Sequence, residues 1–398
     1  MTDGTQRAAP VAVVGAGRWA RQLAETVRAR EPATPLVMHS PAHASALHEW
    51  IAGQPALASA RVTTDYAELG AFAPSAVIVA NAARDHARAI DWALEADVPV
   101  LVEKPFTDSL AKTRRLIETA AAAGRRLYAA HVLMFADYLP AFARRVAPLP
   151  PPRAIVIEWC DPRVEVRHGV SKRFDAGVPV YLDCLPHVVS ILETLLPGCA
   201  LELVGLDYTR GGARLLIKLL VGGTPCEIVL ERHAPVRRRA IRFEGDTAAS
   251  LDFSAEPGTV SILGKAESAD ANWATRPRPM AALIDAFLAA ARGGAPDPRL
   301  DVAIALRAAE LIDLVASVYN SHRLQWLGAA LAGDAHDDVD VAYALAELLQ
   351  AHRALSAGML DAHAERVQRQ FRSSGDIGWL AALAAAADPV AMLDMTAA

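Results

Sequence analysis

The stretch VAVVGAGRWA, residues 11–20, decides the fold of this chain. Four apolar residues lead into the pattern G-x-G-x-x-A, and the residues that follow have the apolar spacing of a helix. In such a strand–turn–helix unit, Gly15 permits the tight turn and Gly17 lets the backbone approach a pyrophosphate. Ala20 lets the helix pack closely on the strand, and the free N–H groups of the helix start complete an anion site. The residues predicted to contact a dinucleotide here are Gly15, Gly17, Arg18 and Trp19. A tight turn without a ligand is the alternative.

Residues up to 147 continue the alternation of strands and helices. Apolar runs predict further strands at 36–38, 76–80 and 98–102, and amphipathic helices are predicted at 85–96 and 109–124. Strands separated by helices of this length predict a parallel sheet that is covered on both faces. We therefore expect a dinucleotide-binding Rossmann domain over residues 1–147.

The periodicity changes after the breaker-rich segment PLPPPR, residues 148–153. Closely spaced strands then predict an open, mostly antiparallel sheet with helices on one face, in a second domain over residues 148–326. Its predicted strands are 154–159, 201–209, 213–221, 225–232, 240–245, 249–253 and 259–263, and its predicted helices are 181–196, 279–294 and 301–321. Residues 327–398 predict an acidic, Ala-rich helical extension that packs on its own chain or on a symmetry mate, or alternatively binds a partner protein. The predicted fold class is α/β.

Composition excludes several classes of protein. Hydrophobic residues make up 53% of the 398 residues and charged residues 21%, which excludes a disordered chain. The net charge of -5 argues against a general nucleic-acid binder, and no apolar stretch is long enough for a transmembrane helix. The first ten residues lack the apolar core of a secretion signal, and the four cysteines lack metal-type spacing, so we expect reduced thiols in a cytoplasmic protein. No metal site is expected, since His336-Asp337-Asp338 is interpreted as a solvated acidic loop.

The end of the second predicted strand bears on the choice of cofactor. This strand runs into His39-Ser40-Pro41, without the acidic residue that usually bonds the adenosine ribose of NAD. A carboxylate there would repel a 2′-phosphate, whereas His39, Ser40 and Arg18 are able to accommodate one. The sequence therefore favours NADP. The alternative is that His39 and Ser40 only begin the following loop and that NAD binds without the acid.

A more specific motif follows the strand predicted at 98–102. Glu103-Lys104-Pro105 and the stretch that precedes it resemble the Gfo/Idh/MocA (glucose–fructose oxidoreductase / inositol dehydrogenase) family, and the resemblance continues through residues 181–198 to Tyr319-Asn320. It implies a Rossmann domain followed by an α/β domain with a large open sheet. It also implies nicotinamide-dependent redox chemistry on a small carbonyl, alcohol or imine, in a homodimer or homotetramer. The cofactor-binding residues implied here are Asn81, His86, Glu103, Lys104 and Pro105.

The physical interpretation of Lys104 agrees with this resemblance. A residue at the carboxyl end of a parallel strand points into the crevice where ligands of such folds bind. We count only five lysines among the 40 basic residues, and unlike arginine a buried lysine can release its proton. Lys104, held by Glu103, is therefore expected to protonate a carbonyl or imine as hydride arrives. The alternative is that Lys104 only hydrogen-bonds the cofactor ribose.

A second pair of candidate catalytic residues lies in the helix predicted at 181–196. Asp183 and His187 are four residues apart, so their side chains share one helix face. The resemblance implies that His187 gives or takes a proton and that Asp183 orients the substrate or the imidazole. A pair on the helix surface without a catalytic role is the alternative.

The chain departs from the family pattern on the substrate side. Pro186 lies inside the helix, the family's Thr-Pro-Asn is replaced by Asn81-Ala82-Ala83, and the basic residue after the sixth strand is replaced near Leu133-Met134. Other residues must then anchor the substrate, and the candidates are His131, Lys172, Arg173 and Tyr181. The departures leave two further functions open, namely a catalytically silent regulator or scaffold that keeps the fold, and a lyase or hydrolase that uses bound NAD.

Overall fold

A computed structural model describes residues 9–167, 170–172, 174–175, 177–333, 336–351 and 355–395. Contacts between Cα atoms divide the chain into two compact units, each built from three segments. Unit 1 comprises Met1–Ala143, Pro186–Pro197 and Asp270–Glu310, and unit 2 comprises Arg144–Leu185, Gly198–Ala269 and Leu311–Ala398. Residues predicted to act together, Lys104 and His187, thus belong to one unit.

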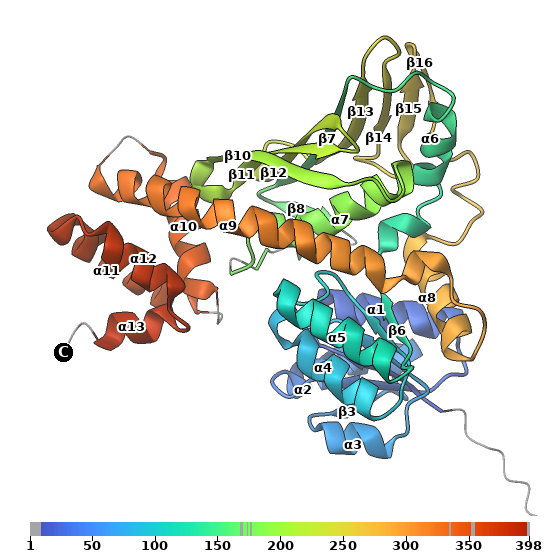
Figure 1. Ribbon diagram of the computed structural model, residues 1–398. Coiled ribbons are helices and arrows are strands. Elements are labelled where there is room, and N and C mark those ends of the chain that lie inside the picture. Colours follow the sequence, from blue (N-terminus) through green and yellow to red (C-terminus); the bar gives the residue numbers. More distant parts are fainter. Residues whose placement is uncertain are drawn as a thin grey trace, which may run out of the picture. The chain divides into compact units, whose positions relative to one another are not determined.

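Unit 1 contains a six-stranded parallel sheet with the order β3-β2-β1-β4-β5-β6 (Figure 1). Its strands are β1 (Val11–Val14), β2 (Leu36–His39), β3 (Arg61–Thr63), β4 (Ala76–Val79), β5 (Val100–Val102) and β6 (Leu127–Ala129). Its helices include α1 (Arg18–Arg30), α2 (Ala44–Ala52), α3 (Tyr66–Ala71), α4 (Ala83–Glu95), α5 (Leu110–Ala122) and α8 (Pro279–Ala291). The strand order reverses between β1 and β4, which is where ligands of doubly wound sheets bind. The predicted Rossmann fold is confirmed.

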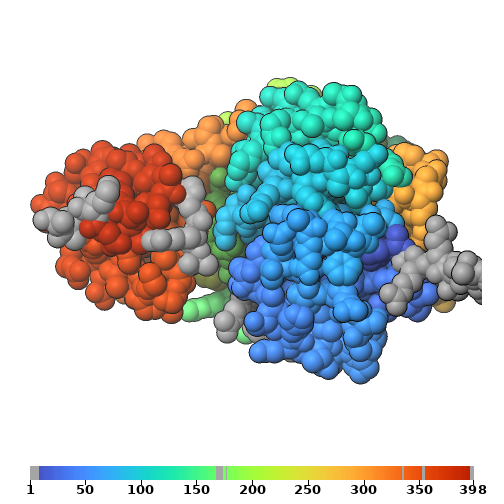
Figure 2. Space-filling view, turned by 90° about the horizontal axis from the view of Figure 1, so that it is seen from below, coloured from blue at the N-terminus to red at the C-terminus, as the bar shows by residue number. Residues whose placement is uncertain are grey.

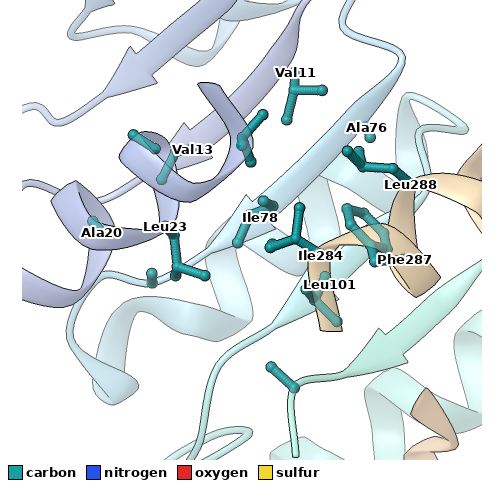
Figure 3. Close-up of a cluster of buried hydrophobic side chains, with 14 of the residues drawn as sticks. Val11, Val13, Ala20, Leu23, Ala76, Ile78, Leu101, Ile284, Phe287 and Leu288 are labelled. Carbon is teal, nitrogen blue, oxygen red and sulfur yellow. The ribbon is translucent and has the colours of Figure 1, made fainter. Parts of the chain in front are cut away.

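A hydrophobic core joins the parallel sheet to two helices that are far apart in the sequence (Figure 3). Leu23 of α1 packs with Ile78 of β4 and Leu101 of β5, and Ile284 and Phe287 of α8 pack in the same cluster. All five side chains are buried. Helix α8 therefore covers the parallel sheet although about 150 residues of chain separate it from the last parallel strand.

Unit 2 contains an eight-stranded sheet with the order β10-β11-β12-β7-β13-β14-β15-β16. Among these, β12 and β7 pair in parallel and every other neighbouring pair is antiparallel, so the predicted, mostly antiparallel sheet is confirmed. The strands are β7 (Ala154–Pro162), β10 (Leu201–Thr209), β11 (Arg214–Val221), β12 (Thr224–Ala234), β13 (Arg238–Glu244), β14 (Ala249–Asp252), β15 (Thr259–Ile262) and β16 (Lys265–Ser268). The strands β8 (Glu165–Arg167) and β9 (Val170–Lys172) pair antiparallel in a separate two-stranded sheet.

Several helices complete the chain. Helix α6 (Tyr138–Val146) leads towards β7, and α7 (Val180–Leu195) and α9 (Val302–Ala332) each contribute residues to both units. The remaining helices are α10 (Asp338–Gln350), α11 (Ala357–Ser374), α12 (Ile377–Ala385) and α13 (Pro389–Met395). Within the described part of the chain, no helix is both long and apolar enough to cross a membrane.

The C-terminal helices have a hydrophobic core of their own. Leu345 and Leu348 of α10 are buried with Phe371 of α11, Leu380 of α12 and Leu393 of α13. These helices form one closely packed group in the space-filling view (Figure 2, red). The predicted helical extension is confirmed, and its packing is internal to unit 2.

Candidate functional site

The glycine turn after β1 has the two properties that a pyrophosphate site requires. Gly15 has a φ of +134°, and a Cβ atom at this position would lie 2.6 Å from the carbonyl oxygen of Ala80. A Cβ on Gly17 would meet no atom within 4 Å, and no side chain caps the N-terminus of α1. The start of α1 is therefore free of a side-chain cap and has room beside Gly17, which suits the phosphates of a dinucleotide.

Buried polar atoms without a hydrogen-bond partner gather at the carboxyl edge of the parallel sheet. Among the described residues of unit 1, they include Nε1 of Trp19, Nε2 of His39, Oδ1 of Asn81, Oε1 of Glu103 and Nε2 of His131. Trp19 lies in the first turn of α1, His39 ends β2, and the other three follow β4, β5 and β6. A buried polar atom without a partner is costly and rare in folded proteins. Their concentration at this edge fits a polar ligand that would supply the missing partners.

His86 of α4 joins two of the loops at this edge. Its Nδ1 lies 3.1 Å from the carbonyl oxygen of Phe106, and its Nε2 lies 3.1 Å from the carbonyl oxygen of Asn81. Burial lowers the pKa of His86, which favours the neutral ring. A neutral ring carries a single N–H, so His86 donates to only one of these two carbonyl oxygens.

Glu103 is a buried carboxyl group next to the glycine turn. The residue is 3% exposed, and its Oε2 accepts a hydrogen bond from the backbone N–H of Lys104 at 3.2 Å. Burial raises the pKa of Glu103 to about 7, while the Trp19 indole and the charge of Lys104 oppose the rise. No well-formed hydrogen bond joins the indole Nε1 to Oε1, so the contact with Trp19 is a loose one.

This carboxyl group predicts a pH dependence of stability. The folded-state pKa of Glu103 is about 7, above its ordinary value of 4.5. The folded state is therefore fully stabilised below pH 4.5, where the carboxyl group is protonated in both states. This stabilisation is lost as the pH rises through 7, because the buried group then ionises. Glu103→Gln removes the ionisation, so we expect the variant to gain up to about 3 kcal/mol over the wild type at pH 8 and little at pH 4.5. Urea unfolding at both pH values measures the difference. Glu95→Gln, at an exposed position of α4, is the control, and an equal gain at both pH values would contradict the assignment.

Lys104 and His131 follow the ends of two neighbouring strands of the sheet. Val102 of β5 pairs with Ala129 of β6, and Lys104 and His131 each follow two residues later. Neighbouring strands lie about 4.8 Å apart, so the ends of β5 and β6 are side by side, and each of the two residues lies two positions beyond such an end. The turn after β5 and the 3₁₀ helix after β6 (Val132–Phe135) therefore begin at the same place.

His131 connects this edge to helix α7. Its Nδ1 lies 3.0 Å from Oγ of Ser190, whose hydroxyl donates to the carbonyl oxygen of Pro186 at 2.7 Å. Because the hydroxyl has a single proton, His131 must donate through Nδ1–H. Its Nε2 then keeps an unprotonated lone pair, and burial lowers the pKa of His131 to about 4, so the ring is neutral at pH 7.

Helix α7 carries His187 into the same unit as Lys104. His187 follows Pro186 directly and precedes Ser190 by three residues, so it lies on the stretch of α7 that His131 holds. Pro186 is inside the helix, as its place in the sequence indicated, and not in the first turn. The structure therefore joins His131 to this part of α7 through Ser190, and the catalytic roles of Lys104 and His187 stay predictions.

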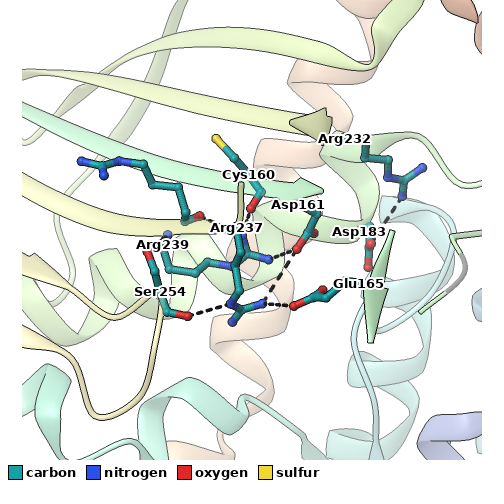
Figure 4. Close-up of polar contacts among 9 residues, drawn as sticks. Cys160, Asp161, Glu165, Asp183, Arg232, Arg237, Arg239 and Ser254 are labelled. Atoms are coloured by element: carbon teal, nitrogen blue, oxygen red, sulfur yellow. Dashed lines mark hydrogen bonds and ion pairs between the residues drawn. The ribbon is translucent and has the colours of Figure 1, made fainter. Parts of the chain in front are cut away.

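Asp183 lies one helical turn before His187 and forms an ion pair within unit 2. Its Oδ2 accepts a hydrogen bond from Nη2 of Arg232 at 3.3 Å (Figure 4). The Asp183 side chain is 30% exposed and that of Arg232 only 2%. Tyr181, two residues before Asp183, packs its ring against that of Tyr319 with 4.7 Å between centroids, and burial raises the pKa of Tyr181.

The other predicted residues occupy varied positions. His39 is fully buried, with Nδ1 3.0 Å from Oγ1 of Thr63, and burial lowers its pKa to about 4. Ser40 is also buried, whereas Arg18 is exposed at the start of α1. Lys172 ends β9, and Arg173 lies outside the described residues. No group of three or more His, Cys, Asp and Glu residues within the described ranges could hold a metal ion.

Arg232 is a functional candidate that sequence reasoning missed. It occupies an inward position of β12, in register with the buried residues Cys226, Ile228 and Leu230. A charged residue in the inward register of a strand is a signal in the sequence, because such a residue requires a buried partner. The identity of that partner, Asp183, depends on how α7 packs and is not readable from the pattern.

Comparisons with known proteins agree with this geometry. Residues 10–131 match the family described as the GFO_IDH_MocA oxidoreductase family, NAD-binding Rossmann fold. No curated protein sequence matches the chain.

Solved structures similar to this chain share its fold. One is a UDP-N-acetylglucosamine 3-dehydrogenase, GnnA from Acidithiobacillus ferrooxidans, with 21% identity, a TM-score of 0.63, and coverage of 78% of this chain and 97% of that one. Another is KijD10, a 3-ketoreductase from Actinomadura kijaniata in complex with TDP-benzene and NADP, with 21% identity, a TM-score of 0.60, and coverage of 77% and 96%. A third is an oxidoreductase from Agrobacterium radiobacter in complex with NAD+, L-tartaric acid and magnesium, with 15% identity, a TM-score of 0.61, and coverage of 79% and 97%.

Proposed function

This chain belongs to the Gfo/Idh/MocA oxidoreductase family, and from that premise we propose an NAD(P)-dependent oxidoreductase in which Lys104 and His187 handle the proton. The observation that carries the proposal is the set of buried, unpartnered polar atoms around the glycine turn and Lys104. The open space at Gly17, the uncapped start of α1 and the close approach of Gly15 to Ala80 fit a dinucleotide. Gly15, Gly17 and the first turn of α1 would hold its phosphates, and Asn81, Glu103 and Lys104 would face its nicotinamide half.

The chemistry divides between the cofactor and the chain. When bound, a reduced nicotinamide supplies a hydride to the carbon of a carbonyl or imine. Lys104 donates the proton that the oxygen or nitrogen needs as the carbon accepts hydride, and His187 replenishes or shares that proton. In the oxidative direction the same groups remove the hydroxyl proton. Asp183, one turn before His187, orients the substrate.

We propose NADP as the preferred cofactor. The end of β2 carries no acidic residue that would repel a 2′-phosphate. Because His39 is buried and neutral, it supplies no positive charge. Of the three residues predicted to accommodate the phosphate, Arg18 is therefore the one that supplies a positive charge. Arg18→Ala is expected to raise the Kd of NADPH about tenfold, since a hydrogen bond to a charged group contributes roughly 1.5–3 kcal/mol. The Kd of NADH is the internal control and should stay unchanged. Equal weakening of both cofactors in a fluorescence titration would contradict this role.

For the substrate we propose a nucleotide-linked sugar, oxidised or reduced at a ring carbon. The support comes from two relatives, one named for UDP-N-acetylglucosamine and one bound to TDP-benzene and named as a 3-ketoreductase. Near Leu133-Met134 this chain lacks the basic residue that is usual in the family. The sugar that this chain binds can therefore differ from the substrates of these relatives.

Absorbance at 340 nm tests the function. Purified protein is mixed with UDP-N-acetylglucosamine and other nucleotide sugars plus NADP+ or NAD+, and with keto sugars plus NADPH or NADH. The proposal expects formation or loss of the reduced cofactor in step with the substrate. Cofactor binding without turnover of any compound would instead favour a regulator, and turnover without net change at 340 nm would favour a lyase or hydrolase.

A further inference from the structure

We propose that Tyr343 of helix α10 positions the carboxylate of Asp183 through Arg232. Tyr343 belongs to the C-terminal extension, residues 327–398, so this extension would take part in holding the Asp183 carboxylate within unit 2. This inference rests on the proposed function, in which Asp183 orients the substrate. Tyr343 is a positioning residue in this account, because it acts through Arg232 and not on the substrate.

The first observation is the set of contacts that holds the Arg232 guanidinium. Nη1 donates to the carbonyl oxygen of Val178 at 2.7 Å and to Oη of Tyr343 at 3.1 Å, while Nη2 donates to Asp183. The ring of Phe174 lies 4.9 Å from the guanidinium carbon. A planar guanidinium has a fixed fork of donors, so the bonds to Val178 and Tyr343 determine where Nη2 points.

The second observation is the difference in burial across the Arg232–Asp183 pair. The Arg232 side chain is 2% exposed and that of Asp183 is 30% exposed, so the guanidinium is buried and the carboxylate is partly accessible. A buried guanidinium needs well-placed partners because desolvation of its charge is costly. An aligned Arg232 therefore holds the more exposed carboxylate in one orientation, as a substrate hydroxyl requires.

The third observation is that α10 makes several polar contacts with other parts of unit 2. Asp340, Tyr343 and Glu347 follow the spacing i, i+3, i+7 and so lie on one face of the helix. Nε of Arg210 lies 3.6 Å from Asp340, and the hydroxyl of Tyr319 donates to Oε1 of Glu347 at 2.6 Å. These acidic residues of the extension thus meet partners from elsewhere in the unit.

Two glycines allow α10 to approach so closely. A Cβ on Gly211 would lie 2.1 Å from the carbonyl oxygen of Asp340, and a Cβ on Gly177 would lie 2.1 Å from that of Gln350. The two ends of α10 are therefore in contact with backbone that only glycine permits. Tyr343, between these ends, has little freedom to move away from Arg232.

The test compares two Tyr→Phe variants of the full-length protein. Tyr343→Phe removes the hydroxyl that meets Arg232, whereas Tyr319→Phe removes a hydroxyl that holds α10 through Glu347 without touching Arg232. With UDP-N-acetylglucosamine and NADP+ as probes, we expect Tyr343→Phe to raise the sugar KM about tenfold with a much smaller change in kcat. Tyr319→Phe should lower the Tm and leave this KM within twofold. Equal changes of KM in the two variants would overturn the proposal.

A measurement without substrate separates this inference from the proposed function. The Tm values of Tyr343→Phe, Asp183→Asn and the double variant form a cycle, and coupling through Arg232 should make the double loss about 2–4 °C smaller than the sum of the single losses. Additive losses would overturn the inference even if the wild type turns over the sugar. Coupling in a protein that turns over none of the compounds would contradict the proposed function instead.

Discussion

Replacing Lys104 with methionine is expected to lower kcat by roughly 10²–10⁴-fold, the usual contribution of a general acid or base. Methionine keeps most of the length of the side chain but supplies no proton. Lys104 follows β5 at the edge of the sheet where the unpartnered polar atoms gather. The Kd of NADPH should change less than kcat, which stopped-flow turnover and a fluorescence titration measure separately.

Lys112→Met is the matched control for this variant. Lys112 lies on α5, eight residues along the chain, where its Nζ pairs with Asp108 at 2.8 Å on the exposed surface. The control should retain full activity, because it removes a lysine without touching the sheet edge. If Lys104 only hydrogen-bonds the cofactor ribose, Lys104→Met would raise the Kd of NADPH and leave kcat nearly unchanged, and the catalytic assignment would be wrong.

Changing Gly15 to alanine is expected to reduce stability, whereas changing Gly17 to alanine is expected to reduce cofactor binding. Gly15→Ala places a Cβ 2.6 Å from the Ala80 carbonyl oxygen at a φ of +134°, so we expect a loss of about 3 kcal/mol or more in unfolding free energy. Gly17→Ala meets no atom within 4 Å and has an ordinary φ of -67°, so the fold should survive. Its methyl group would instead occupy the space that the phosphates need.

Thermal unfolding and NADPH titration together separate these effects. Gly17→Ala should keep the Tm of the wild type within about 2 °C and weaken NADPH by about tenfold or more. Gly15→Ala should lower the Tm strongly. A Gly17→Ala variant that binds NADPH as the wild type does would show that the turn is only structural, which is the alternative that the sequence left open.

The sequence predicts those helices, strands and turns whose pattern is contained in a short stretch of residues. The G-x-G-x-x-A turn, the apolar runs of β1, β4 and β5 and the alternating strands of unit 2 are all present as expected, because strand and helix periodicity report burial directly. The strands β3 and β6 were not predicted, since neither lies in an apolar run as long as residues 98–102, the run that contains β5. Helix α9 extends to Ala332, beyond the predicted end at residue 321, because no strong breaker stops it.

The candidate site was predictable only in part. Lys104 could be placed at a strand end from the motif alone, and Asp183 and His187 share a helix face through their spacing. The bond from His131 to Ser190 and the docking of Tyr343 on Arg232 join segments 59 and 111 residues apart, and no local pattern encodes such pairings. The unpartnered atoms of Glu103 and Asn81 likewise depend on burial that only the folded chain shows.

The most direct test of the central claim is a crystal structure of the protein with NADP+ and UDP-N-acetylglucosamine bound. The account predicts the pyrophosphate at the Gly15–Gly17 turn and the start of α1. It also predicts Nζ of Lys104 and the imidazole of His187 within about 3.2 Å of one substrate oxygen, directly or through one water. A dinucleotide bound elsewhere, or Lys104 and His187 reaching no common substrate atom, would contradict it.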